Sequence, residues 1–134
     1  MIVVDESIHS RRIREAIAAW YQGQVISVTA LRSGSIVKDD GISVLLRQVV
    51  QPTFVTINVS DFWLKSRADQ RCCIVALALN QSQAYEAPSL IRRLFRFPEF
   101  HTKAARMGKV LHVLPTYIEY YELDRQIQTI SWFR

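Results

Sequence analysis

Residues 54–63 read FVTINVSDFW. β-branched and aromatic side chains fill the first half of this stretch, which predicts a buried strand over residues 54–58. The strand runs into a polar turn at Val59-Ser60-Asp61, and the bulky pair Phe62-Trp63 follows. Polar side chains therefore come directly after the end of a buried strand.

The start of the chain repeats this arrangement. Ile2-Val3-Val4 is a short β-branched run that stops at Asp5-Glu6, which predicts a buried parallel strand ending in two acids. Ser7 or Ser10 can cap the helix that follows, because a hydroxyl there accepts an unpaired backbone N–H. Apolar residues at helical spacing over residues 13–20 give this helix one apolar face.

Strands alternate with helices along the rest of the chain. Further strands are predicted at residues 24–31, 71–79 and 110–114, and further helices at residues 39–50, 88–97 and 98–107. Residues 116–132 predict a C-terminal antiparallel hairpin around Asp124-Arg125. We expect one domain, residues 1–134, with a three-layer α/β/α fold and a mostly parallel central sheet. Its crossovers should be right-handed, and ligands should bind beyond the carboxyl ends of its strands.

The charge of the chain permits a polyanionic partner. Seventeen Lys and Arg against twelve Asp and Glu give a net charge of +5. Residues 88–109 carry six cations against Glu99, namely Arg92, Arg93, Arg96, Lys103, Arg106 and Lys109. The candidate nucleic-acid-binding residues are Arg11, Arg12, Arg92, Arg93 and Arg96. The alternative is a solvated helix face that serves only solubility.

Apolar runs, cysteines, histidines and tyrosines indicate where the protein acts in the cell and what it could bind. No run reaches the roughly 18 apolar residues that span a bilayer, and the N-terminus does not have the pattern of a signal peptide. Adjacent Cys72 and Cys73 predict reduced core residues in a cytoplasmic protein, not a disulfide. The scattered histidines predict no zinc site. Outward rings among Tyr117, Tyr120 and Tyr121 would suit a protein interface, either a homodimer or a small inhibitory partner.

Three acidic groups follow or open predicted elements. Asp5-Glu6 ends the first strand, Asp39-Asp40 opens a helix, and Asn58 and Asp61 follow the strand at residues 54–58. If these two strands are neighbours, the groups converge on one sheet edge, and a divalent cation such as Mg²⁺ would relieve their repulsion. Such a cation lowers the pKa of a bound water and stabilises a reacting phosphate. Each acid could instead be a helix cap or a loop residue.

The order of these motifs resembles the PIN-like nucleases. I-V-V-D-E, a helix, a strand, a D-D-x-I helix start and then F-V-T-I-N-V-S-D-F-W look most like the short VapC-type and Mut-like PIN proteins. The resemblance covers about residues 1–80. It implies a Mg²⁺- or Mn²⁺-dependent endoribonuclease that acts on single-stranded RNA. By the same resemblance, such short chains are often toxins silenced by a small antitoxin-like protein.

The resemblance also implies the ligands of the metal. Asp5, Asp39 and Asp61 match the catalytic, metal-binding acids of the family, with Asp40 as a substitute for Asp39 and Glu6 as a secondary candidate. Asn58 stands where many members have an aspartate, and its spacing to Asp61 is one residue longer than usual. A neutral ligand leaves one-metal hydrolysis, or a catalytically inactive nucleic-acid- or protein-binding module, as alternatives. A flavodoxin-like small-molecule binder is disfavoured, because no Gly-rich phosphate loop follows any strand.

Overall fold

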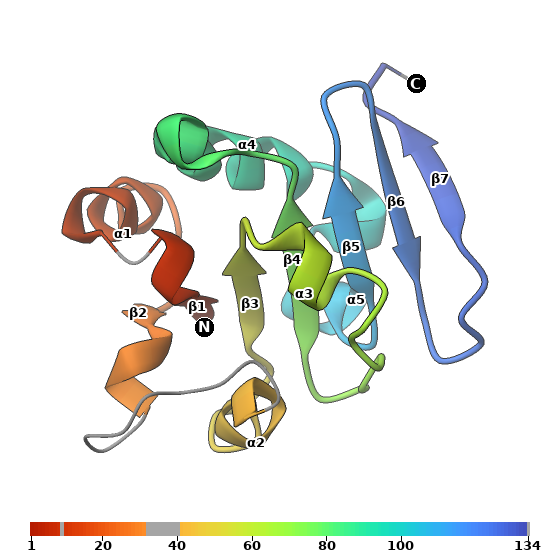
Figure 1. Cartoon of the computed structure of the whole chain (residues 1–134), viewed down its shortest axis with the longest axis horizontal. Coiled ribbons are helices and arrows are strands. Elements are labelled where there is room, and N and C mark those ends of the chain that lie inside the picture. The colour runs from red at the N-terminus through yellow and green to blue at the C-terminus, as the bar shows by residue number, and fades with distance from the viewer. Residues whose placement is uncertain (9, 32–40, 134) are drawn as a thin grey trace.

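The centre of the fold is a single twisted sheet. The computed structural model describes residues 1–8, 10–31 and 41–133, and their strands pair in the order β2-β1-β3-β4-β5-β6-β7 (Figure 1). β1 to β5 are parallel, and β6 and β7 form the antiparallel C-terminal hairpin. The strands are β1 Ile2–Val4, β2 Val25–Ser27, β3 Thr53–Thr56, β4 Cys73–Leu77, β5 Val110–Val113, β6 Tyr117–Tyr121 and β7 Gln128–Ser131. The predicted mostly parallel sheet with a terminal hairpin is therefore confirmed.

Helices cover both faces of this sheet. α1 (Arg11–Ala18) and α4 (Ala87–Leu94) pack on one face, and α2 (Ile42–Leu46) and α3 (Val59–Phe62) pack on the other. α5 (Lys103–Arg106) precedes β5. Alternate strand residues enter two hydrophobic clusters, one on each face, so β1, β3 and β4 are buried on both sides, whereas the edge strand β2 is only partly buried. This is the expected three-layer α/β/α arrangement. No helix of the described residues has the length and apolar character needed to cross a membrane.

Local hydrogen bonds decide where several elements begin and end. The Ser10 hydroxyl caps α1 by accepting the backbone N–H of Ile13 at 3.2 Å. The strand predicted at residues 24–31 stops at Ser27, because its hydroxyl accepts the Thr29 N–H at 3.3 Å and the chain turns into a 3-10 helix at Val28–Leu31. The predicted turn at residues 59–61 instead forms the short helix α3.

The segment between β4 and β5 also differs from its prediction. The predicted helix at residues 88–97 is α4, which a 3-10 helix over Gln81–Glu86 precedes. The predicted helix at residues 98–107 is divided into a 3-10 turn, Pro98–Phe100, and α5. Thr102 separates the two because its hydroxyl accepts the Ala105 N–H at 3.0 Å and starts a new helix.

One crossover has an unexpected hand. β2 lies on one side of β1 in the sheet, whereas β3, β4 and β5 follow one another on its other side. The connection from β1 to β2 therefore runs in one direction across the sheet, and the later connections up to β5 run in the opposite direction. α1 and α4 nevertheless lie on the same face and contact each other. The β4–α4–β5 crossover is therefore opposite in hand to the other parallel crossovers, and the expectation of right-handed connections throughout is wrong here. The right-handed rule describes a strand that feeds one helix directly, whereas residues 78–109 form a long connection with several helical turns.

The structure bears on two expectations about burial, for the cysteines and for the hairpin tyrosines. Cys72 and Cys73 are free thiols, as predicted, and burial raises the pKa of Cys72 to about 11 and that of Cys73 to about 12, so both are neutral at pH 7. Tyr120 and Tyr121 are buried, and the half-buried Tyr117 has only part of its surface exposed, which is less exposed tyrosine than expected on the hairpin. A homodimer or a small partner stays a prediction without that support.

Arg106 is the largest charged group inside the protein. It is 2% exposed, and its guanidinium donates to the Thr53 hydroxyl at 3.1 Å and to the Phe100 and His101 carbonyls at 2.9 and 3.1 Å. It also lies 3.9 Å above the Phe95 ring. Burial lowers its pKa, but these partners let the charge stay inside. Arg106 thus joins α5 to β3 and to the segment after α4.

Replacing Arg106 tests this internal link. Arg106→Ala leaves the Thr53 hydroxyl and two carbonyls without their donor, so we expect the free energy of unfolding to fall by about 2–4 kcal/mol. Urea denaturation followed by tryptophan fluorescence measures the change. Lys103→Ala removes an exposed cation from the same helix and should change stability by less than about 0.5 kcal/mol. Equal stability of the two variants would contradict the structural role of Arg106.

Candidate functional site

The candidate site lies where the sheet reverses its strand order. β1 pairs with β2 on one side and with β3 on the other, in parallel on both sides. Helices α1 and α2, which follow β1 and β2, lie on opposite faces, so the switch point of the strand order falls at the carboxyl ends of β1 and β3 (Figure 1). In open α/β sheets this switch point is where ligands bind. Asp5 is the first residue after β1 and lies at this point.

Two hydroxyl groups hold the Asp5 carboxylate. Its Oδ2 accepts hydrogen bonds from Ser7 Oγ at 2.9 Å and from Thr56 Oγ1 at 2.8 Å. The Asp5 backbone N–H also donates to the Val55 carbonyl at 2.8 Å, which continues the β1–β3 ladder by one residue. Asp5 is 8% exposed and Thr56 is fully buried. The carboxylate is thus fixed in a largely dry position, because these donors compensate part of its lost hydration.

A chain of hydrogen bonds continues from Asp5 to Asp61. Thr56 Oγ1, which donates to Asp5, accepts the Asn58 backbone N–H at 2.9 Å. The Asn58 side chain then donates through Nδ2 to Asp61 Oδ2 at 2.7 Å. Asp61 Oδ1 lies 4.0 Å from Lys65 Nζ, which stands in the turn after α3. Asp5, Asn58 and Asp61 therefore belong to one connected polar network at the end of β3.

The predicted metal ligands are only partly brought together. Asp39 and Asp40 lie outside the residues that the structure describes. Among residues 1–8, 10–31 and 41–133, no group of three or more His, Cys, Asp or Glu side chains could hold a metal ion. Asn58 presents its amide nitrogen to Asp61, and its Oδ1 accepts the Ser60 hydroxyl at 3.3 Å. In this arrangement Asn58 orients Asp61, and the predicted ligand oxygen of Asn58 is already engaged.

Glu6 has a different environment from its neighbour. It opens the 3-10 turn Glu6–Ile8 and is exposed, whereas Asp5 is buried. An exposed carboxylate at the first turn of a helix is favoured by the helix dipole without any ligand. Glu6 therefore contributes less to a defined site than Asp5 does.

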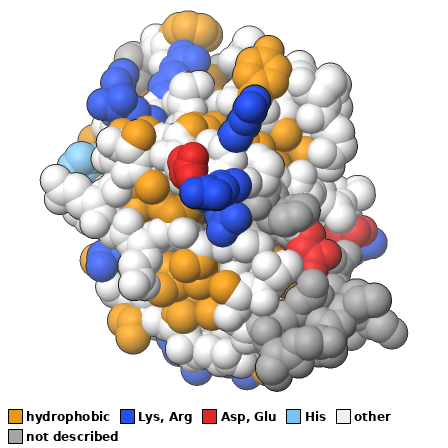
Figure 2. Space-filling view, turned by 90° about the vertical axis from the view of Figure 1, so that its left-hand side faces the viewer, with side chains coloured by type: hydrophobic (Ala, Val, Ile, Leu, Met, Phe, Trp, Pro, Cys, Tyr) orange, Lys and Arg blue, Asp and Glu red, His pale blue; other side chains and the backbone are white. Residues whose placement is uncertain are grey.

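The basic residues differ in their burial and in their partners. Arg11 pairs with Glu15 at 2.8 Å, and Arg93 lies 4.4 Å over the Trp132 ring. Lys109 Nζ donates to the Glu99 and Ala105 carbonyls at 2.9 and 2.7 Å, so with Arg106 it serves the interior of the fold. Arg12, Arg92 and Arg96 are exposed. On the face in Figure 2, Lys and Arg side chains lie in several places among apolar and uncharged atoms, and one central group lies beside an acidic side chain.

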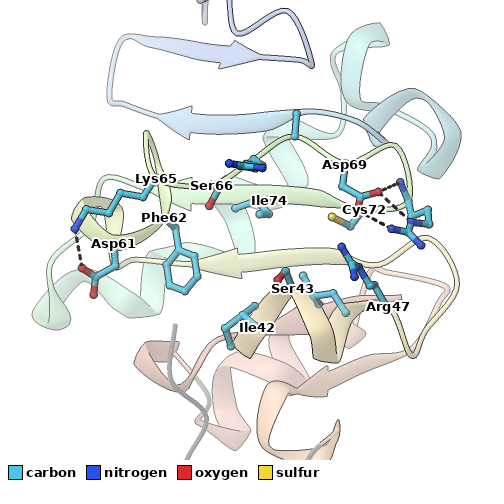
Figure 3. Close-up of a pocket in the computed structure, with 14 residues that line it drawn as sticks. Ile42, Ser43, Arg47, Asp61, Phe62, Lys65, Ser66, Asp69, Cys72 and Ile74 are labelled. Carbon is cyan, nitrogen blue, oxygen red and sulfur yellow. Dashed lines mark hydrogen bonds and ion pairs between the residues drawn. The ribbon is translucent and has the colours of Figure 1, made fainter. Parts of the chain in front are cut away.

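A cavity adjoins the network on the α2 and α3 face. Its volume is about 630 Å³, and it lies between α2 and the segment of residues 65–72 (Figure 3). Asp61 and Lys65 stand at one end of it, and Asp69 and Arg47 at the other. Asp61 thus belongs both to the network with Asn58 and to the wall of the cavity.

Sequence reasoning missed two residues of the site. It treated Ser7 as a possible helix cap, and it did not single out Thr56, although both hydroxyls bind Asp5. A signal was present for Ser7, which stands two residues after Asp5, but Thr56 falls in the middle of the strand predicted at residues 54–58, and only the structure ends that strand at Thr56. The sequence could not show that these two strand ends are adjacent. The cavity was missed because its lining comes from distant segments.

Fold and site together define an α/β protein with a polar network at the switch point of a doubly wound sheet. No protein-family model, curated protein or solved structure matches this chain. The likeness to PIN-like nucleases therefore rests on the sequence motifs alone.

Removing the Thr56 hydroxyl tests the network. Thr56→Val keeps the shape of the side chain but removes a donor to Asp5 and the acceptor of the Asn58 N–H, so we expect a loss of about 1–3 kcal/mol in the free energy of unfolding. Chemical denaturation measures the loss. Thr129→Val is the same change at an exposed position of β7, and it should leave the free energy of unfolding nearly unchanged. A Thr56→Val protein as stable as Thr129→Val would show that the network contributes nothing.

Proposed function

We propose that this protein is a metal-dependent endoribonuclease of the PIN-like class that cleaves single-stranded RNA. The observation that carries the proposal is the buried Asp5 carboxylate at the sheet's switch point, held by Ser7 and Thr56 and linked through Asn58 to Asp61. A pre-oriented carboxylate pair at the carboxyl ends of parallel strands suits a hydrated divalent cation. The order of the sequence motifs supports the same class.

Asp5 and Asp61 would hold Mg²⁺ or Mn²⁺ in this proposal. Both hydrogen bonds that described side chains donate to Asp5 go to Oδ2. Asp39 or Asp40 would supply a further carboxylate. A bound cation would polarise water and neutralise charge on the phosphate. Ser7 and Thr56 would orient Asp5. Asn58 would orient Asp61. Exposed arginines such as Arg12 would attract the RNA backbone.

The resemblance extends the proposal to a biological role. Short PIN-like chains are often toxins, so we include a small antitoxin-like protein as a candidate partner and the cytoplasm as the place of action.

A second candidate function is a catalytically inactive nucleic-acid- or protein-binding module with the same fold. The observation that favours it is the short Asn58–Asp61 hydrogen bond, together with Lys65 beside the same carboxylate. Both groups compensate the charge of Asp61 without a metal. A cation would then have to compete with protein donors for this carboxylate.

Cleavage assays distinguish these functions. Wild-type protein should cut labelled single-stranded RNA in Mn²⁺, and Asp5→Asn should reduce the rate by about 100-fold or more, since the amide keeps the size of the side chain but loses its charge. Asp124→Asn makes the same chemical change in the exposed hairpin turn and should cut at the wild-type rate. Circular dichroism of each variant checks the fold.

Two results would count against the enzyme. Equal cleavage by wild type and Asp5→Asn would assign the activity to another site or to a contaminant. Binding of RNA by the wild type without any cleavage in Mn²⁺ or Mg²⁺ would favour the inactive module.

A further inference from the structure

The cavity beside Asp61 combines an apolar floor with a charged rim. Ile42, Leu46, Phe62 and Ile74 form the floor and are each at least nine-tenths buried. A cavity of about 630 Å³ is within the range of about 300–1,000 Å³ typical of ligand pockets. The Ser43 and Ser66 hydroxyl groups also line it and can bond to polar edges of a ligand. Such a cavity suits a ligand with a flat apolar body and polar edges.

The rim of the cavity carries more positive than negative charge. Four cations line it, Arg47, Lys65, Arg67 and Arg71, against the two acids Asp61 and Asp69. Formal charges thus give +4 − 2 = +2 for the lining. An anionic group on the ligand would therefore be attracted to this rim.

The two acids of the rim are already engaged with neighbours. Arg71 donates to both Asp69 carboxylate oxygens at 3.2 Å, and these hydrogen bonds are the main reason why the pKa of Asp69 is lowered. Asp61 accepts from Asn58 and lies near Lys65.

Arg47 and Arg67 supply the excess charge. Both are exposed at the cavity, and neither forms an ion pair with a residue in the described part of the chain. Planar guanidinium groups bind phosphate through paired N–H donors. Arg47 lies on the α2 wall and Arg67 on the wall of residues 65–72, so an anionic ligand between these walls would have an available arginine on each side, while its body lies over the floor.

We propose that this cavity binds one nucleotide of single-stranded RNA, with its phosphate at Arg47 and Arg67 and its base over the apolar floor. The position of this nucleotide in the RNA rests on the proposed nuclease function. Asp61 belongs both to the cavity and to the acidic network, so the bound nucleotide is the one that flanks the cleaved bond. The cavity would then select for unpaired RNA, since a base must leave its stack to enter.

Binding measurements with catalytically blocked protein test the assignment. In the Asp5→Asn background, the anisotropy of a fluorescent single-stranded RNA oligonucleotide gives its affinity. Arg47→Ala/Arg67→Ala should weaken binding about tenfold or more and reduce its salt dependence, because two phosphate contacts are lost. Lys103→Ala/Arg125→Ala removes two exposed cations outside the cavity and should leave the affinity within about twofold.

Cys72 gives a second measurement that reports position. It lines the cavity and is half-buried, whereas Cys73 is fully buried. Bound oligonucleotide should slow the alkylation of Cys72 by a maleimide, and Cys72→Ser protein should lose the protected signal. Circular dichroism of the arginine variant separates a lost contact from a lost fold.

The outcomes separate this inference from the proposed function. Unchanged affinity of the arginine variant, or unprotected Cys72 at saturating oligonucleotide, overturns the cavity assignment even if the wild type cleaves RNA. Lost affinity and protected Cys72, combined with a wild type that does not cleave, support nucleotide binding in the cavity and overturn the proposed catalysis.

Discussion

The central position of β1 is the constraint on which the candidate site depends. Its three residues are fully buried, and they pair in parallel with β2 on one side and β3 on the other. β-branched side chains fill both faces of such a strand, so IVV cannot be displaced without opening both hydrophobic clusters. The residue after this strand, Asp5, must then emerge beside the end of β3. A side chain that is ordinary in sequence thus gains a fixed place next to Thr56.

Burial gives Asp5 its chemical character. Removing a carboxylate from water is costly, so Ser7 and Thr56 hydroxyls take over part of its hydration. The charge of Asp61 is stabilised differently, by the Asn58 amide and by the nearby Lys65 ammonium group. Two acids of one network are therefore held by different donors. Because of this difference, the surroundings of Asp5 are compatible with a metal ligand, whereas those of Asp61 are also compatible with a protein that binds no metal and has no catalytic activity.

Much of the fold could be predicted from local patterns, but the site depends on distant contacts. The alternation of apolar strands and amphipathic helices predicts the parallel sheet, and IVVDE places Asp5 at a strand end. The hand of the β4–β5 crossover could not be predicted, because it depends on how a long connection packs on α1. The inward role of Arg106 was hidden by a run of cations that resembles a solvated surface. The lining of the cavity comes from residues 42–74, which only the folded chain brings together.

Anomalous X-ray diffraction from crystals grown with Mn²⁺ tests directly whether Asp5 and Asp61 hold a metal. A metal site held by both acids would give a manganese peak at the carboxyl ends of β1 and β3, about 2.0–2.4 Å from a carboxylate oxygen of Asp5 and from one of Asp61. For this, the Asp61 carboxylate must exchange at least one of its present partners for the metal. A peak elsewhere, or no peak at saturating Mn²⁺, would contradict a metal site at the switch point.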